Sequence, residues 1–299
     1  MTMAVDNSSV EGVSDEADTI RSPLRELLRD VVGSPAGLVV LAYLALLLFV
    51  AVFATRLMPF DPYTQTLSNR LQGMSAGHWL GTDELGRDVF SRMISATRIA
   101  LIAPTVAVAV ALAIGLPTGL LAGFRKSRLT AVFDRIADTL LSLPPIVAAI
   151  AIIAVLGPGL VKAMLAIGLV YSPRIYRIVR GATMSVARET YVESAKAIGC
   201  SSTRILWGHC LPNILAPLLV QISLMLGFAL LAESSLSFLG LGVQLPEASW
   251  GSMLRSASQH QIRKPYGVVA PGVAISVTIL AFNVLGDVVR DALAKRGNV

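Results

Sequence analysis

The residues best suited to chemistry are concentrated in one polar segment, 189–213, which reads ETYVESAKAIGCSSTRILWGHCLPN between long apolar runs. Its ionisable and sulfur-containing side chains are Glu189, Glu193, Lys196, Cys200, Arg204, His209 and Cys210. With two cysteines in the whole chain and no CxxC pair, the thiols match neither a zinc site nor a disulfide framework. His78, His209 and His260 are isolated in the sequence. We therefore expect no metal site.

Two motifs that would indicate an enzyme are missing. The chain has no GxxxxGK[ST] loop, whose backbone N–H groups hold ATP phosphates. It also lacks the HExxH motif of a metalloprotease. The sequence therefore predicts no catalytic residues and no cofactor bound to this chain.

Composition indicates a membrane protein. Of the 299 residues, 54% are hydrophobic and 15% charged, whereas soluble domains are about 25% charged. The mean hydropathy is +0.68, and the apolar residues form runs close to the ~20 residues that cross a bilayer. The net charge of +6 comes from basic residues in short loops, where they set topology, so we exclude nucleic-acid binding. The predicted fold is all-α and polytopic.

Six transmembrane helices are predicted, forming a domain over 36–292. They cover 36–55, 96–123, 133–156, 161–178, 213–237 and 268–289. The Lys and Arg distribution places both termini and the polar segment inside, and the loops 57–95 and 238–267 outside. We expect 1–35 to be a cytoplasmic tail, disordered in its first part, and 293–299 to be a short cytoplasmic tail.

Glycines repeat at four-residue intervals in the second predicted span, at Gly115, Gly119 and Gly123. Small residues at this spacing let helix backbones approach closely in lipid. We favour packing within the chain, and a contact with another subunit is the alternative.

The polar segment is predicted to form an elbow of two short helices. One face of the first helix carries Tyr191, Val192, Ala195 and Ile198. Gly199 is expected to end this helix, and Ser201 or Ser202 to cap a second one over 203–210, which stops before Leu211-Pro212. Small residues on the elbow suit a protein groove, whereas an amphipathic elbow could instead lie on lipid headgroups.

The spacing in this elbow resembles a known family. Glu193-Ser194-Ala195, three residues, Gly199, nine residues and then His209-Cys210-Leu211-Pro212 look like the EAA loop of binding-protein-dependent ABC importer permeases. This chain departs from the family pattern at Ser194, which replaces alanine, and at His209, which replaces isoleucine.

Two further stretches, 78–101 and 233–254, resemble the dipeptide/oligopeptide permeases, in particular their C-type subunit. The resemblance covers about 36–292. It implies a type I importer in a bacterial cytoplasmic membrane, with a sibling B-type permease, two ABC ATPase subunits that bind ATP and magnesium, and an extracytoplasmic substrate-binding protein. Peptides are the implied cargo; nickel, glutathione or another small solute is the alternative. The class-level alternative is a stand-alone channel or secondary transporter.

Three groups of site residues follow. The resemblance implies that the ATPase-coupling residues are Tyr191, Glu193, Ser194, Ala195, Ile198, Gly199, Leu211 and Pro212. A carboxylate in lipid costs about 2.5–3.5 kcal/mol, so Glu233, with Ser234 and Ser235, is expected to shape the translocation path or its gate. A hydrated cap at the membrane interface is the alternative for Glu233. Residues of the outer loops expected to dock the binding protein are Asp83, Arg87, Asp88 and Trp250.

Overall fold

The computed structural model describes residues 29–125, 127–260, 262 and 265–295. Most of the predicted N-terminal tail and the last four residues lie outside this range. Within it the chain is helical, and the only strand-like pairing is an isolated bridge between Thr82 and Asp88.

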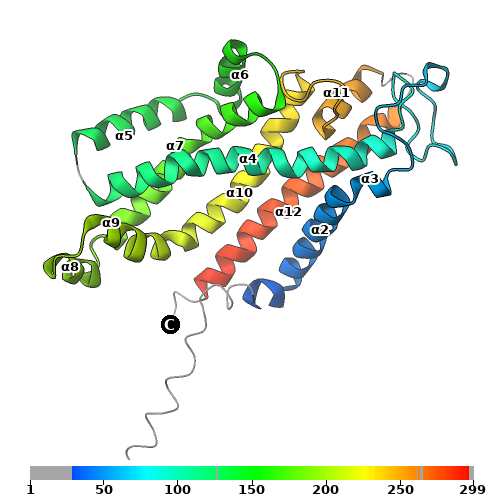
Figure 1. The fold of residues 1–299 in the computed structure, drawn as a ribbon. Coiled ribbons are helices and arrows are strands. Elements are labelled where there is room, and N and C mark those ends of the chain that lie inside the picture. Colours follow the sequence, from blue (N-terminus) through cyan, green and yellow to red (C-terminus); the bar gives the residue numbers. More distant parts are fainter. Residues whose placement is uncertain (1–28, 126, 261, 263–264, 296–299) are drawn as a thin grey trace, which may run out of the picture.

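Four helices are long and apolar enough to cross a membrane. They are α2 (Pro35–Val52), α4 (Val89–Phe124), a continuous helix over Ser202–Phe238 that includes α10 (Leu211–Phe238), and α12 (Val269–Ala294), which is preceded by the 3-10 turn η4 (Pro265–Val268). The helices α10, α12 and α2 run side by side in this order, and α4 crosses them, in contact with α10 and α2 (Figure 1). Shorter elements connect them, including α3 (Ala54–Leu57), η2 (Leu67–Asn69) and α11 (Trp250–Gln259).

The third predicted span is wrong as a single helix. Residues 133–156 fall in two helices, α5 (Arg128–Leu141) and α6 (Pro145–Leu156), which are bent by 98° relative to each other. Pro144 has extended backbone angles, and Pro145 begins α6. A proline disfavours the α conformation in the residue before it, so two successive prolines end one helix and start another.

The fourth predicted span, 161–178, lies within α7 (Leu160–Val186), which is long enough to cross a membrane but carries basic side chains. Arg174, Arg177 and Arg180 recur along it, and α7 is not among the four strongly apolar helices. The described residues therefore give four apolar spans, or five if α5 and α6 count as one, and the predicted number of six is not confirmed.

The glycine ridge packs within the chain, as the sequence favours. A Cβ on Gly115 would lie 2.6 Å from the carbonyl oxygen of Ser172, and one on Gly119 would lie 2.8 Å from that of Tyr176. A Cβ on Gly123 would lie 2.6 Å from the side chain of Thr183. All three contacts are with α7. Because these glycines have no side chain, the backbones of α4 and α7 can approach each other closely.

Replacing Gly119 with alanine should disrupt this packing. Because the added methyl group would meet backbone as well as the Val179 side chain, α4 and α7 would have to separate, at a cost of about 1–3 kcal/mol. We expect a lower melting temperature in detergent and less protein in the membrane. Gly181→Ala on α7 is the control, since a Cβ there meets nothing within 4 Å. Equal stability of the two variants would contradict the close packing of α4 against α7 at Gly119.

The two ends of the described chain lie at the same end of the bundle. Val31 packs with Val288 and Ala292 of α12. The short helices α8 (Thr190–Ala197) and α9 (Ser202–Ile205) lie at this end too, while α11 lies at the opposite one (Figure 1). We call these the elbow end and the loop end.

Candidate coupling elbow and loop-end pocket

The predicted contact face of α8, the first elbow helix, is partly buried and partly exposed. Val192 is fully buried and Ala195 nearly so, in a cluster that includes Ile205 of α9. Tyr191 and Ile198 are exposed instead. Ala195 therefore packs inside the chain, and the surface open to a partner contains the other two side chains.

Gly199 ends the first helix as predicted. Its φ of +82° is in the left-handed region, which favours glycine. Its N–H donates to the carbonyl oxygen of Lys196 (3.1 Å), and the N–H of Cys200 donates to that of Ala195 (3.0 Å). These two bonds are the Schellman pattern of a helix C-terminus. Ser201 then caps α9 by accepting a hydrogen bond from the N–H of Arg204, which confirms the predicted break and cap.

The second elbow helix does not stop before Leu211-Pro212, which corrects the sequence prediction. It passes from α9 through a π-helical turn, η3 (Leu206–Cys210), directly into α10. Proline has no N–H, and its ring clashes with the carbonyl four residues earlier in a straight α-helix. The wider turn places the N–H of Leu211 on the carbonyl of Leu206, and the Asn213 side chain donates to the carbonyl of His209. The proline is thus accommodated within one continuous helix.

Side-chain contacts tie the elbow to the ends of two bundle helices. The Lys196 ammonium donates to the carbonyl of Ala187, just after α7, and lies 4.9 Å from the ring centre of Phe124 at the end of α4. Arg125 donates to the Ser202 hydroxyl at 2.7 Å. Because α10 is also continuous from η3, the elbow is attached to α4, α7 and α10.

An exposed apolar surface covers the outside of the elbow. It consists of Ile198, which is 80% exposed, Trp207, which is 55% exposed, and Tyr191, which is 44% exposed. We call these three residues the elbow patch. The pKa of Tyr191 is raised, first by partial burial and then by the charge of Glu189, so its phenol stays neutral. Trp207 is not among the coupling residues predicted from the sequence. The signal that could have identified it is a tryptophan within a segment that is expected to lie at the surface.

The other predicted coupling residues differ in exposure. Glu193 and Ser194 are exposed on α8, and the Ser194 hydroxyl bonds to the carbonyl of Thr190 in its own helix. Leu211 is partly buried and Pro212 is exposed, both within the continuous helix. Their role in coupling remains a prediction.

Glu233 lies inside the chain at the loop end of α10. It is 1% exposed, and its carboxylate accepts hydrogen bonds from the hydroxyls of Ser237 (2.7 Å) and Ser234 (3.4 Å). Ser237 in turn accepts a hydrogen bond from the N–H of Val243. The carboxylate therefore anchors the turn after α10, and its role in a path or gate remains a prediction. Ser235 bonds only to the Leu231 carbonyl in its own helix.

Replacing Ser237 with alanine should destabilise this turn. The change removes a donor to the buried Glu233 carboxylate and an acceptor for Val243, at a cost of about 1–3 kcal/mol. Thermal unfolding in detergent should show a lower midpoint. Ser235→Ala, two residues earlier, should have little effect; if the two variants unfold at the same temperature, the anchoring role is wrong.

The side chains of the predicted docking residues contact other residues of this chain. Asp83 pairs with Arg87 at 2.7 Å, and Arg87 is only 2% exposed. Asp88 caps α4 by accepting from the N–H of Ser91. Trp250 is 3% exposed, and its ring N–H donates to the carbonyl of Met93. These side chains give the loop end its shape, and whether that surface docks a binding protein remains a prediction.

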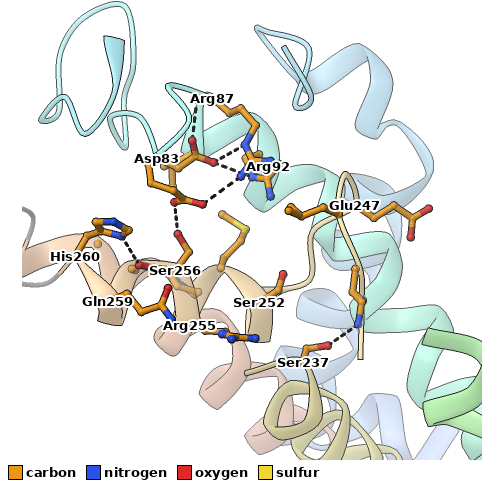
Figure 2. Close-up of a pocket in the computed structure, with 18 of the residues that line it drawn as sticks. Asp83, Arg87, Arg92, Ser237, Glu247, Ser252, Arg255, Ser256, Gln259 and His260 are labelled. Carbon is orange, nitrogen blue, oxygen red and sulfur yellow. Dashed lines mark hydrogen bonds and ion pairs between the residues drawn. The ribbon is translucent and has the colours of Figure 1, made fainter. Parts of the chain in front are cut away.

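A pocket of about 300 Å³ lies at this end. Asp83, Arg87 and Arg92 line one side, and Ser256 of α11 and His260, which follows α11, line the other (Figure 2). Its polar groups largely satisfy one another: Asp83 also pairs with Arg92, Ser256 donates to Glu84, and a ring nitrogen of His260 lies 3.0 Å from the Ser256 carbonyl. The pocket walls are therefore held by an ion-pair and hydrogen-bond network.

A possible nucleophile motif was overlooked in the sequence. Gly73–Gly77 reads GMSAG, which matches GxSxG, and a ring nitrogen of His78 lies 2.9 Å from the Asp88 carboxylate. However, Ser75 lies in an exposed loop, whereas a nucleophile elbow joins a strand to a helix. Its hydroxyl accepts a hydrogen bond from the backbone N–H of His78 and not from the ring. The geometry does not form a catalytic triad.

Comparison with known proteins identifies the family. Residues 115–298 match the family described as binding-protein-dependent transport system inner membrane component. The chain is also 41% identical over 280 residues to the glutathione transport system permease protein GsiD of Pectobacterium atrosepticum, covering 92% of each chain. The chain belongs to this permease family. The resemblance inferred from the elbow is thereby confirmed, and the protein is a multi-pass membrane component of a transport system.

Another relative and a solved structure are also similar to this permease. It is 41% identical to the dipeptide transport system permease protein DppC of Alkalihalophilus pseudofirmus, over 92% of this chain and 90% of that one. An inward-facing structure of the MetNI methionine ABC transporter matches with a TM-score of 0.57 at 18% identity, over 68% of this permease and 97% of that chain. The structural match supports the predicted type I importer permease fold.

Proposed function

We propose that this permease is the C-type transmembrane subunit of an ATP-driven bacterial importer for di- and oligopeptides. The observation that carries the proposal is the elbow patch, an exposed apolar surface on a rigid projection that is continuous with α10. The importer contains two ABC ATPase subunits, which bind ATP and magnesium, and one of them takes up this patch in a groove. A sibling B-type permease forms the other half of the path.

The proposed mechanism is alternating access driven through the elbow. Closure of the ATPase dimer displaces the elbow, and its ties at Lys196 and Arg125 carry α4, α7 and α10 with it. Rigid-body rocking of two bundles around a central site is a common transporter mechanism. Reversing a 1:99 equilibrium requires about 5.5 kcal/mol of differential binding, a scale that two well-packed elbow contacts can supply.

The elbow end faces the cytoplasm in this proposal, and so do both termini. The short basic loop at Arg125 and Arg128 is at the start of α5, near the elbow, as expected for a cytoplasmic loop. The loop end, with its internally braced pocket, then faces the extracytoplasmic binding protein.

Peptide cargo is supported by a relative that is named for dipeptide transport. Glutathione is supported by a relative that is named for glutathione transport and is equally similar, at 41% identity. Glutathione is therefore the second candidate. Transport assays should include both, each with the binding protein loaded to saturation.

Reconstitution tests the proposal. The permease, its sibling and the ATPases, co-expressed and purified, should form a stable complex. In proteoliposomes, uptake should require ATP and the loaded binding protein. Flux through the permease alone, with no ATPase retained during purification, would instead establish a channel or secondary transporter.

A further inference from the structure

Three arginines lie along α7, and two of them form ion pairs with carboxylates of α5. Arg177 forms an ion pair with Asp138, and Arg180 pairs with Asp134 at 3.0 Å. Arg174 differs: no carboxylate among the residues that the structure describes pairs with it. Its guanidinium instead lies over the ring of Phe228 on α10, 5.3 Å from the ring centre.

Arg174 is far from both ends of its helix. It is 12 residues from Val186 and 14 from Leu160, or about 18 and 21 Å at the rise of an α-helix. The neighbouring residues Ser172 and Ile175 pack on Gly115, within the apolar part of α4. The guanidinium therefore lies away from both ends of α7 and beside the apolar part of α4.

At this position along α7, Arg174 and Phe228 are both exposed on the surface of the chain. A charged side chain deep in a membrane protein faces a water-filled cavity or a protein partner, because hydrocarbon does not solvate it. The exposed surface between α7 and α10 therefore contains a cation that has no carboxylate partner among the described residues.

The geometry suits a carboxylate. The guanidinium carbon lies over the Phe228 ring, and the guanidinium N–H groups form no ion pair with a described carboxylate. Those N–H groups match the two oxygens of a carboxylate. Tyr171, one turn before Arg174, has its hydroxyl within 3.4 Å of the Phe228 carbonyl oxygen, which fixes the spacing of α7 and α10 at this point. The site is thus preorganised across two helices.

We propose that Arg174, stacked on Phe228, is a subsite of the translocation path that binds the terminal carboxylate of the cargo peptide. This inference rests on the proposed function, since it deepens the path that the permease forms with its sibling. The paired residues Arg177 and Asp138, one turn nearer the elbow end, present both charges and continue the polar surface along α7.

A photoreactive peptide tests the proposal directly. The probe is a tripeptide with a C-terminal benzoylphenylalanine and a free carboxylate, delivered by the loaded binding protein to the full importer trapped with vanadate. We expect crosslinks to α7 and α10 close to Phe228. In Arg174→Gln their yield should fall about tenfold or more, as for loss of a charge-assisted contact, and Arg174→Lys should retain part of it.

Two further measurements separate the alternatives. Lys162→Gln removes a charge from the outer start of the same helix and should leave the crosslinks unchanged. If Arg174 instead pairs with a carboxylate of the sibling permease, Arg174→Gln should reduce complex yield and leave the crosslink yield per complex as in wild type. That result, or crosslinks at other helices, overturns the subsite. Failure of the proposed function would be distinct, because wild-type importer would then take up no peptide.

Discussion

Replacing Gly199 with proline is expected to lower cargo uptake by at least about tenfold while the permease still folds into the membrane. Proline fixes φ near −65° and has no N–H, whereas Gly199 has a φ of +82° and donates to the Lys196 carbonyl. The turn must therefore rearrange, at a cost of about 3 kcal/mol or more, and the elbow patch is displaced. Uptake and ATPase activity in proteoliposomes measure the effect.

The permease bundle should still fold, because nothing lies within 4 Å of a Cβ built on Gly199 and the strain is therefore confined to the turn after α8. Gly208→Ala is the matched control: it lies in the same elbow, also meets nothing within 4 Å, and has no positive φ. Its uptake should equal wild type. If Gly199→Pro transports as well as Gly208→Ala, the elbow is not the coupling joint.

Replacing Ile198 with aspartate should detach the ATPase subunits. Ile198 is 80% exposed, so the substitution leaves the permease core intact, yet it places a charge on the most exposed residue of the elbow patch. Apolar anchors at interfaces typically contribute 2 kcal/mol or more, so we expect about a 30-fold loss of ATPase affinity or greater. The affinity of the purified permease pair for ATPase measures this loss.

Trp207→Ala should weaken the same interaction, because tryptophan is enriched among residues that dominate binding. Met74→Asp is the control, since Met74 is an equally accessible apolar residue (64% exposed) in the loop-end segment. Undiminished ATPase binding by Ile198→Asp would mean that the patch contacts something else.

Local chemistry made much of the elbow predictable. The left-handed Gly199, the Ser201 cap and the burial of Gly115 and Gly119 against a neighbouring helix each follow from one residue type and its immediate spacing. Such features depend on backbone conformation and steric space, which neighbouring residues in the sequence largely determine.

Other features depend on partners that are distant in the sequence. Trp250 and Asp83 looked like exposed loop residues, but Trp250 bonds to Met93 and Asp83 to Arg92. Pro212 was read as a stop signal because a π-helical turn that absorbs it has no sequence signature of its own. The sequence predicts one span over 133–156, although Pro144 and Pro145 together separate α5 from α6.

Crosslinking from position 198 tests the coupling claim most directly. A photoreactive amino acid at this position, in the intact importer within its native membrane, should join the permease to a nucleotide-hydrolysing subunit, with a yield that changes when ATP is added. Adducts with phospholipid alone, in the presence or absence of ATP, would contradict the account.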